Sequence, residues 1–167
     1  AGAHVVLADR TEADLEEVAA QVRARGRRAL ALPTDVTDAD SCAAAIDKAA
    51  AEMGGIDGIV YTPGVGPLKK LADMDAETWR WVFDTNVTGA AITTAAALPH
   101  LQASAGRAIF LSSVSASLTP TWPGLGAYNV SKAALDKLVE AWRGENPEVG
   151  FTCLIVFSRS PMSRGFG

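Results

Sequence analysis

The chain has 167 residues, of which 49% are hydrophobic and 20% charged, and its net charge at neutral pH is −4. This length and composition are ordinary for one soluble globular domain with a sizeable core. The negative charge, and the lack of any apolar run near the roughly 18 residues of a membrane span, argue against nucleic acid or a membrane as a partner.

The first part of the chain contains three strand-like apolar runs separated by two helical patterns. In chain order we expect a strand over 5–8, a helix over 12–25, a strand over 29–32, a helix over 39–53 and a strand over 58–61. The first run is continuously apolar, which is typical of a strand buried on both faces. Thr11 is a plausible N-cap, with Asp14 three residues on in a capping-box arrangement, and Asp38 can cap the second helix.

The second part continues this alternation after a loop rich in proline and glycine. We expect a helical region from Asp75 toward Leu101, a strand over 107–112, a helix from Tyr128 to about Arg143 and a strand over 151–157. Gly89 is expected to break the long helical region and Pro99 to end it. The pattern predicts a single α/β domain over residues 1–167, a doubly wound parallel sheet with helices on both faces and thus three layers.

The sequence Gly126-Ala127-Tyr128-Asn129-Val130-Ser131-Lys132 places a phenol and an ammonium one helical turn apart. A phenol is a poor acid or base at neutral pH because its unperturbed pKa is about 10, and a nearby ammonium lowers that pKa by stabilising the phenolate. Tyr128 can then act as a general acid or base. Taken alone, the pair is better explained by an amphipathic helix with one solvated lysine.

Three other short motifs precede this helix and change that balance. They are an apolar run that ends in Asp9-Arg10, the sequence Thr85-Asn86-Val87-Thr88-Gly89, and an apolar run that ends in Ser112-Ser113. In this order and at these spacings, the motifs resemble those of the short-chain dehydrogenase/reductase family over nearly the whole chain. The resemblance implies a Rossmann-type fold and a nicotinamide-dependent oxidoreductase. The combination of Asn, Ser and Tyr-x-x-x-Lys is fairly specific, whereas each part alone is not.

One part of the family pattern is missing. A Rossmann domain begins with a central strand and a glycine-rich turn that binds the pyrophosphate of the cofactor. The residues before Val5 contain neither, so the strands at Val5 and Gly58 are expected to face each other across an empty position. Because their backbone groups would be unpaired there, we expect either that the folding unit has further residues or that the chain is a fragment.

The resemblance implies that the cofactor is bound by Asp9, Arg10, Asp35, Val36, Gly64, Tyr128 and Lys132. A carboxylate at Asp9 can accept hydrogen bonds from the adenosine ribose and repels a 2′-phosphate, which favours NAD over NADP. The alternative is a loop carboxylate that caps the next helix. Arg10 weakens the preference, because a guanidinium can pair with a phosphate. Asp35 and Val36 match the pair that contacts the adenine, and a simple Asp turn explains Asp35 nearly as well.

The loop after the third strand departs from the family. The family has Asn-Ala-Gly there, and this chain has Tyr61-Thr62-Pro63-Gly64. Gly64 keeps the conformational freedom of the turn, whereas Pro63 lacks an N–H and has a fixed φ angle. The turn can therefore be kept, but without the asparagine that normally forms hydrogen bonds there.

The resemblance implies four catalytic residues: Asn86, Ser113, Tyr128 and Lys132. Tyr128 exchanges the proton with the substrate oxygen and Ser113 orients that oxygen. Lys132 lowers the pKa of the tyrosine and binds the nicotinamide ribose, while the backbone carbonyl of Asn86 holds a water of the proton relay. Ser112 and Ser115 are alternatives to Ser113. The usual family spacing points to Ser115, but we prefer Ser113 because the end of a strand holds a side chain more precisely than a loop.

We therefore expect an NAD-dependent alcohol dehydrogenase or carbonyl reductase that interconverts a secondary alcohol and a ketone by hydride transfer, without a metal. The alternative is a protein that keeps the fold but has lost turnover, which the altered turn and the missing glycine-rich turn favour.

The segment from Trp79 to Ala97 resembles the helices through which the family associates, so we expect a homodimer or homotetramer with a small-molecule substrate. Two isolated cysteines, Cys42 and Cys153, indicate a reducing compartment, and we expect a cytoplasmic protein.

Overall fold

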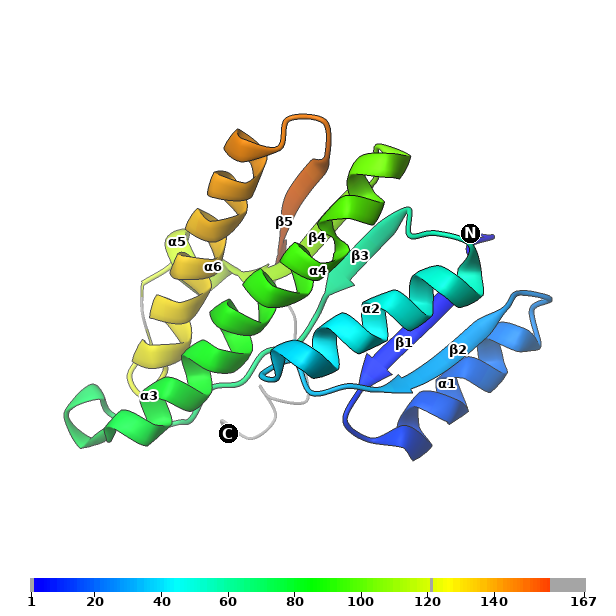
Figure 1. Ribbon diagram of the computed structural model, residues 1–167. Helices are drawn as coiled ribbons and strands as arrows, with labels where there is room; N and C mark the ends of the chain where they lie inside the picture. Colours follow the sequence, from blue (N-terminus) through cyan, green and yellow to red (C-terminus); the bar gives the residue numbers. More distant parts are fainter. Residues whose placement is uncertain (1, 121, 157–167) are drawn as a thin grey trace.

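A computed structural model describes residues 2–120 and 122–156, which form an α/β fold (Figure 1). Its elements follow in this order: β1 (Val5–Asp9), α1 (Glu12–Arg23), β2 (Ala29–Pro33), α2 (Ala39–Met53), β3 (Gly58–Tyr61), η1 (Leu71–Asp73), α3 (Ala76–Phe83), η2 (Asp84–Thr88), α4 (Gly89–Ser104), β4 (Arg107–Ser113), α5 (Val114–Ser117), α6 (Gly126–Glu145) and β5 (Gly150–Val156). The predicted strands are confirmed to within a residue or two. Phe157, at the end of the last predicted strand, lies outside the described residues.

The strands form two parallel sheets. β1 pairs with β2, in a register that places Val5 beside Ala29, and β3, β4 and β5 form the second sheet in that order. Within the described residues no backbone ladder joins β1 to β3, as predicted for two strands on either side of an empty position. Helix α2 connects the two sheets, because it packs against both β2 and α4 (Figure 1).

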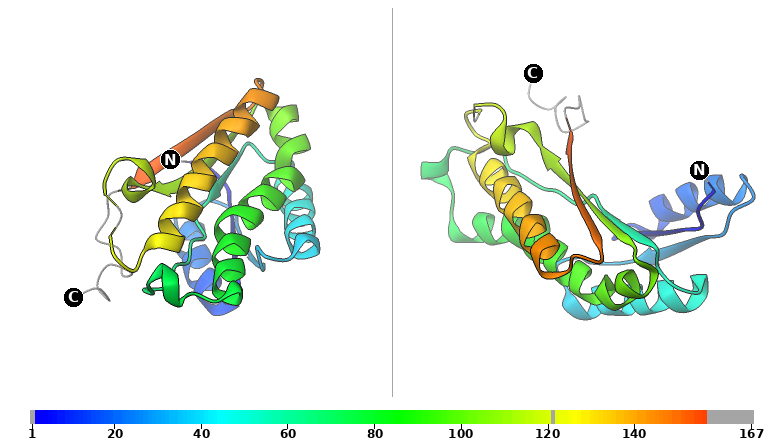
Figure 2. Two further views of the ribbon diagram at one scale, coloured as in Figure 1. Left: turned by 90° about the vertical axis from the view of Figure 1, so that its left-hand side faces the viewer. Right: turned by 90° about the horizontal axis from the view of Figure 1, so that it is seen from above.

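Helices cover the sheets in layers. α2, α4 and α6 lie on one face, and α1 lies on the opposite face of β1 and β2 (Figure 2). The prediction of a first strand buried on both faces is too strong, because residues 5–7 of β1 are only half-buried and Ala8 is exposed. On the second sheet, Val60 and Leu154 are 61% and 51% exposed. The strand register puts both on the face away from Tyr61 and Phe110, which pack against α4 and α6. Of the described helices with eight or more residues, none covers that face.

The core lies between the second sheet and the helices on its covered face. Its buried members are Tyr61, Ala90, Ala97, Leu101, Ala108, Phe110, Leu135, Val139, Val149 and Phe151. Neighbouring side chains of a strand point to opposite faces, so alternate residues of β4 enter this core. The packing of α6 on β4 places the first turns of the helix beside the carboxyl end of the strand.

Acidic side chains begin two of the helices as predicted. Asp38 accepts hydrogen bonds of 2.9 and 3.2 Å from two N–H groups in the first turn of α2, and Asp75 accepts one of 2.7 Å from the N–H of Thr78. Such N–H groups have no partner within the helix. The hydrogen bonds from Thr78 lower the pKa of Asp75 to about 2. Thr11 occupies the N-cap position of α1, but its side chain makes no capping hydrogen bond, so the predicted capping box is wrong.

The long helical segment differs from the prediction in two places. α3 does not run on to a break at Gly89: it ends at Phe83, and one π-helical turn, η2, leads directly into α4. Pro99 does not end α4, which continues to Ser104. A proline inside a helix removes a backbone hydrogen bond. Ala97 and Leu101 on either side of it are fully buried, and this tertiary packing outweighs the local preference.

Candidate active site

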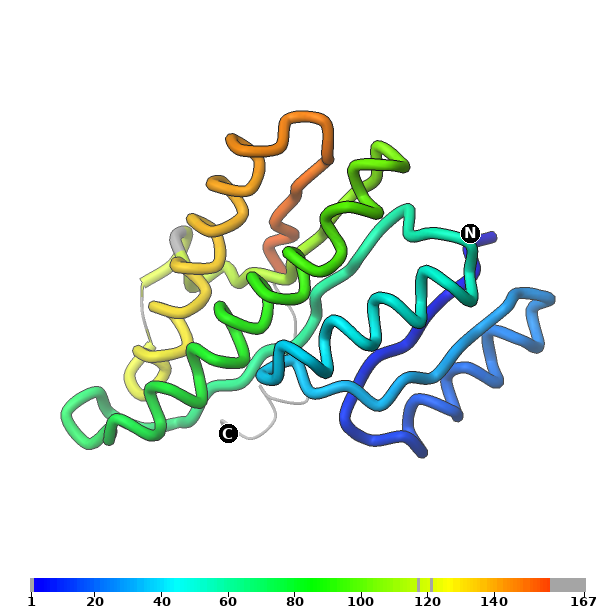
Figure 3. The backbone as a smooth tube through the Cα atoms, in the orientation of Figure 1, coloured from blue at the N-terminus to red at the C-terminus, as the bar shows by residue number. Residues whose placement is uncertain are grey.

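The loop after β3 runs past the first turn of α6 (Figure 3) and contacts two of the predicted catalytic residues. A Cβ atom at Gly66 would lie 2.8 Å from the Cβ of Tyr128, and one at Gly64 would lie 3.2 Å from the Nζ of Lys132. There is no room for a side chain at Gly66 and little at Gly64. The loop therefore keeps its position beside α6 despite Pro63, because the two glycines let the backbone approach the helix closely.

Lys132 lies one turn after Tyr128 on the same face of α6, as the spacing predicts. Its ammonium group is 5.8 Å from the centre of the Tyr128 ring and donates a hydrogen bond of 2.8 Å to the carbonyl of Leu111 in β4. Lys132 is only 3% exposed, and burial lowers its pKa to about 8. Asp136 and Cys153 oppose this shift electrostatically. The structure thus contains a buried lysine with an unusually labile proton.

The pKa of Tyr128 moves in the direction opposite to the prediction. Burial of the phenol raises the pKa, and a hydrogen bond with Ser113 lowers it only in part. Lys132 has no such effect, because its ammonium lies over the ring and donates to Leu111. In this arrangement Tyr128 is a protonated hydrogen-bond donor at neutral pH.

The three candidate serines have different surroundings. Ser113 lies beside Tyr128, and its Oγ is 2.8 Å from the Oγ of Ser115. Ser115 donates a hydrogen bond of 2.7 Å to the Oδ1 of Asn129 in α6. Ser112 faces the core, and its buried hydroxyl has no hydrogen-bond partner in the described part of the chain. The end of β4 therefore brings Ser113 to the phenol and turns Ser112 away from it, while Ser115 contacts Ser113 and Asn129.

Asn86 lies in the π-helical turn η2 and is fully buried. Its Oδ1 accepts a hydrogen bond from the N–H of Val65, and its Nδ2 donates to the carbonyl of Val65 and to the Oγ of Ser131, all at 2.8 Å. The side chain thus connects the loop after β3 to α6. The role predicted for Asn86 rested on its backbone carbonyl, so the part played by the side chain was missed.

Sequence reasoning also missed Ser131. Its Oγ accepts from Asn86 and donates a hydrogen bond of 2.7 Å to the carbonyl of Tyr128, three residues earlier in α6. A serine inside a helix commonly bonds to a carbonyl of the preceding turn, and this tendency was the available signal. A serine on the surface of a helix would form only this local bond. Ser131 is fully buried, and its hydroxyl therefore also contacts a second element through Asn86.

The predicted cofactor residues lie at the carboxyl ends of parallel strands, which share one edge of the fold. Asp9 accepts a hydrogen bond of 3.1 Å from the N–H of Thr11. This is the local role that was the alternative to ribose binding, and a carboxylate has lone pairs for both. Asp35 accepts bonds from the N–H and hydroxyl of Thr37, which lower its pKa, and Arg10 adds a smaller electrostatic contribution.

This edge has features that fit a nicotinamide cofactor. Gly64 and Gly66 bring the backbone so close to α6 that a Cβ would occupy the space beside Lys132 and Tyr128. The carbonyl of Val36 lies 2.7 Å from where a Cβ of Gly89 would be, so the loop after β2 reaches the helix that follows Asn86. Carboxylates at Asp9 and Asp35 can accept hydrogen bonds from the hydroxyl and amino groups of an adenosine.

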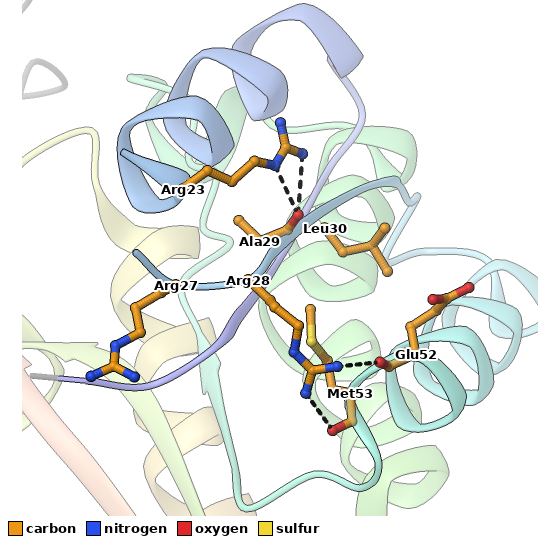
Figure 4. A pocket seen from close by; sticks show the side chains of 7 residues that line it. All are labelled: Arg23, Arg27, Arg28, Ala29, Leu30, Glu52 and Met53. Atoms are coloured by element: carbon orange, nitrogen blue, oxygen red, sulfur yellow. Dashed lines mark hydrogen bonds between the residues drawn. The ribbon is translucent and has the colours of Figure 1, made fainter. Parts of the chain in front are cut away.

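A separate cavity of about 410 Å³ lies at the opposite ends of the strands (Figure 4). It is lined by Arg23, Arg27, Arg28, Ala29, Leu30, Glu52 and Met53. Arg23 donates to the carbonyl of Ala29, and Arg28 donates to the carbonyls of Glu52 and Met53. These guanidinium groups hold the start of β2 against the ends of two helices, and none of the predicted site residues lines the cavity. It is therefore not the candidate active site.

Helices long and apolar enough to cross a membrane do not occur in the described part of the chain. Groups of three or more His, Cys, Asp or Glu side chains that could hold a metal ion are also absent from residues 2–120 and 122–156.

The sequence model of the short chain dehydrogenases matches residues 1–157. The chain belongs to the short-chain dehydrogenase/reductase family. It is 34% identical, over 98% of its length, to 11-beta-hydroxysteroid dehydrogenase A of Sesamum indicum, of which it covers 48%. It is 42% identical, over 65% of its length, to cis-4-hydroxycyclohexanecarboxylate dehydrogenase of Sinomonas cyclohexanicum, of which it covers 43%. The chain thus spans less than half the length of these two curated relatives.

Solved structures of short-chain dehydrogenases/reductases share the fold. A putative short-chain alcohol dehydrogenase from Sinorhizobium meliloti superposes with a TM-score of 0.90 at 30% identity, over 99% of this chain and 66% of that one. An alcohol dehydrogenase from Thermococcus sibiricus, complexed with 5-hydroxy-NADP, gives 0.84 at 25% identity, over 91% and 63%. A member from Burkholderia phymatum in complex with NAD gives 0.81 at 29% identity, over 91% and 55%. The Rossmann-type fold is confirmed, and the family uses nicotinamide cofactors of both kinds.

Proposed function

We propose that this protein is an NAD-dependent oxidoreductase that interconverts a secondary alcohol and a ketone. The observation that carries the proposal is the grouping of Ser113, Tyr128 and Lys132 at the carboxyl end of β4 and the start of α6. Two neighbouring hydroxyl groups can bind one substrate oxygen between them, and one of the two can exchange a proton with it. Family membership supports the same reaction class.

The residues of the chain have separate tasks in this proposal. Ser113 orients the substrate oxygen and Tyr128 transfers the proton at that oxygen. Lys132 supplies a cation beside the phenol, and Asn86 holds the loop after β3 against α6. When bound, the nicotinamide cofactor supplies or accepts the hydride. The phenol is protonated at neutral pH, which is the state that donates a proton to a carbonyl oxygen.

A secondary alcohol on a saturated ring is the substrate class we infer. The names of the two relatives, one acting on a hydroxycyclohexanecarboxylate and one on an 11-beta-hydroxysteroid, both describe such an alcohol. Apolar side chains near the start of α6 support this inference, since Leu68, Leu71 and Trp122 are each more than half exposed. Leu68 lies beside Gly124 and Leu71 beside Gly126, so both leucines flank the approach to Tyr128.

The experiment measures reduced nicotinamide by absorbance in the protein that carries this chain. NAD+ and NADP+ are each tested with cis-4-hydroxycyclohexanecarboxylate, an 11β-hydroxysteroid and a linear primary alcohol as a control. We expect turnover of at least one ring alcohol, faster with NAD+ than with NADP+, and little with the primary alcohol. Turnover with the primary alcohol alone would contradict the inferred substrate class.

A cofactor-binding protein without turnover is the second candidate. The observation that favours it is the turn Tyr61-Thr62-Pro63-Gly64, which lacks the asparagine of the family. Calorimetric titration with NAD+ and NADP+ separates the two candidates. Binding without turnover on the whole panel would select the inactive protein, and the absence of both binding and turnover would reject both proposals.

We further infer that the protein forms a homodimer or homotetramer through α3 and α4. Trp81 in α3 is 44% exposed, which is unusual for a large aromatic side chain away from an interface and supports association there. Sedimentation velocity should give a dimer or tetramer that Trp81→Lys dissociates. A parent protein that sediments as a monomer would contradict this inference. The cytoplasmic location stays a prediction.

A further inference from the structure

Tyr61 begins the turn that differs from the family pattern, and its side chain has a specific partner. The residue ends β3 and is 4% exposed, and its hydroxyl donates a hydrogen bond of 2.6 Å to the backbone carbonyl of Thr85. Burial raises the pKa of Tyr61, so the phenol keeps its proton and remains a donor over the whole working pH range. Tyr61 therefore connects the second sheet to the turn that carries Asn86.

The carbonyl of Thr85 is available because of the π-helical turn. In an α-helix this carbonyl would accept from the N–H of Gly89, four residues on. In η2 the N–H of Gly89 donates to the carbonyl of Asp84 instead. The hydroxyl of Tyr61 thus takes the place of the helical donor to Thr85, and the bond stabilises the π-helical register against the α-helical one.

Gly89 makes this approach possible. A Cβ atom there would lie 2.5 Å from the hydroxyl oxygen of Tyr61 and 2.7 Å from the carbonyl of Val36. Both distances are far below van der Waals contact, so a side chain at Gly89 would displace the phenol. The hydrogen bond from Tyr61 to Thr85 therefore requires a glycine at position 89.

The register of η2 decides where the side chain of Asn86 points, because Asn86 directly follows Thr85. Asn86 binds both backbone groups of Val65 and the hydroxyl of Ser131, which in turn donates to the carbonyl of Tyr128. A shift of η2 to α-helical register would rotate Asn86 away from these partners.

We propose that Tyr61 is a positioning residue, whose hydrogen bond to the Thr85 carbonyl holds the π-helical turn that presents Asn86 to Val65 and α6. The proposal concerns the geometry of the site, and only its kinetic test rests on the proposed function.

The first test is amide hydrogen exchange at Val65, followed by NMR in 15N-valine-labelled protein without cofactor. Tyr61→Phe removes only the hydroxyl and should accelerate exchange at Val65 about tenfold, as the loss of an ordinary hydrogen bond would. Gly89→Ala displaces the same phenol from the other side and should have the same effect. The matched control is Thr94→Val, which removes a buried hydroxyl that donates to the Ala90 carbonyl in α4. It should leave Val65 at the parent rate.

Kinetics provide the second readout. If the parent turns over a ring alcohol, Tyr61→Phe should lower kcat about tenfold and leave the KM for the cofactor unchanged, because Tyr128 is then less well placed. Exchange at Val65 within twofold of the parent in Tyr61→Phe, or an equal acceleration in Thr94→Val, would overturn the proposal. A parent without turnover would refute the proposed function but leave the exchange experiment decisive for Tyr61.

Discussion

The ammonium group of Lys132 lies 5.8 Å from the centre of the Tyr128 ring and is held there by the carbonyl of Leu111. The lysine therefore sits over the face of the ring, where it attracts the π electrons and does not bond to the phenol oxygen. Burial lowers the pKa of the lysine and raises that of the tyrosine, so the pair is less charged than two solvated groups would be.

Tyr128→Phe should abolish turnover and spare cofactor binding. The phenylalanine keeps the ring and its packing but cannot donate or accept a proton, and general acid–base catalysis contributes about 10²- to 10⁴-fold. Steady-state kinetics and calorimetric titration with NAD+ give the two quantities. Turnover at the parent rate would show that Tyr128 is not the catalytic acid or base.

Lys132→Met should change how stability depends on pH. Since the folded protein lowers the pKa of Lys132 from 10.5 to about 8, the unfolded state binds more protons between these pH values, and stability rises with pH there. The full effect of this lysine is at most about 3 kcal/mol. Chemical denaturation at pH 7, 8 and 9 should show the parent gaining stability relative to Lys132→Met. If the difference in stability between the parent and Lys132→Met were the same at all three pH values, folding would not lower the pKa of Lys132.

Three serine variants test the end of β4. Ser113→Ala should lower kcat/KM by roughly 10²-fold, since it removes the hydroxyl beside Tyr128. Ser115→Ala should have a smaller effect through the loss of its bonds to Ser113 and Asn129. Ser112→Ala is the control: it removes a buried hydroxyl without a partner in the described residues and should leave kcat/KM unchanged and stability equal or higher. A larger loss for Ser115→Ala than for Ser113→Ala would assign the role to Ser115.

Gly66→Ala should destabilise the protein and slow it. The added Cβ would lie 2.8 Å from the Cβ of Tyr128, so the loop or the helix must shift, which costs about 1–3 kcal/mol. Gly144→Ala is the matched control, because no atom lies within 4 Å of its added Cβ and alanine favours the helix α6 by about 0.5–1 kcal/mol. Thermal unfolding should give a lower Tm than the parent for Gly66→Ala and a higher Tm for Gly144→Ala. A neutral Gly66→Ala would show that the loop is not in contact with Tyr128.

Asp9→Ala should weaken the preference for NAD+ over NADP+. The carboxylate repels a 2′-phosphate and accepts from ribose hydroxyls, so its removal should change the ratio of the two Kd values by about tenfold or more. Asp14→Ala removes the same charge from the first turn of α1 and should leave the ratio as in the parent. If both variants change the ratio equally, the preference comes from the general charge of this end of the molecule.

Much of the site was predictable because its residues act through short spacings and strand ends. Residues four apart lie on the same face of a helix, which places Tyr128 beside Lys132. Ser113 could be located because it ends an apolar run that predicts a strand. The side-chain role of Asn86 could not be read in this way. Its partners, Val65 and Ser131, lie 21 and 45 residues away, and no local rule relates them.

Local chemistry in the sequence determined the strands, the acidic helix caps at Asp38 and Asp75, and the face shared by Tyr128 and Lys132. Such features depend on backbone groups only a few residues apart. Tertiary structure alone decided that α4 continues through Pro99, that η2 is a π-helical turn held by Tyr61, and that burial moves the pKa of Tyr128 upward. These outcomes depend on which distant atoms exclude water from a group or supply its hydrogen bond, and packing between elements sets both.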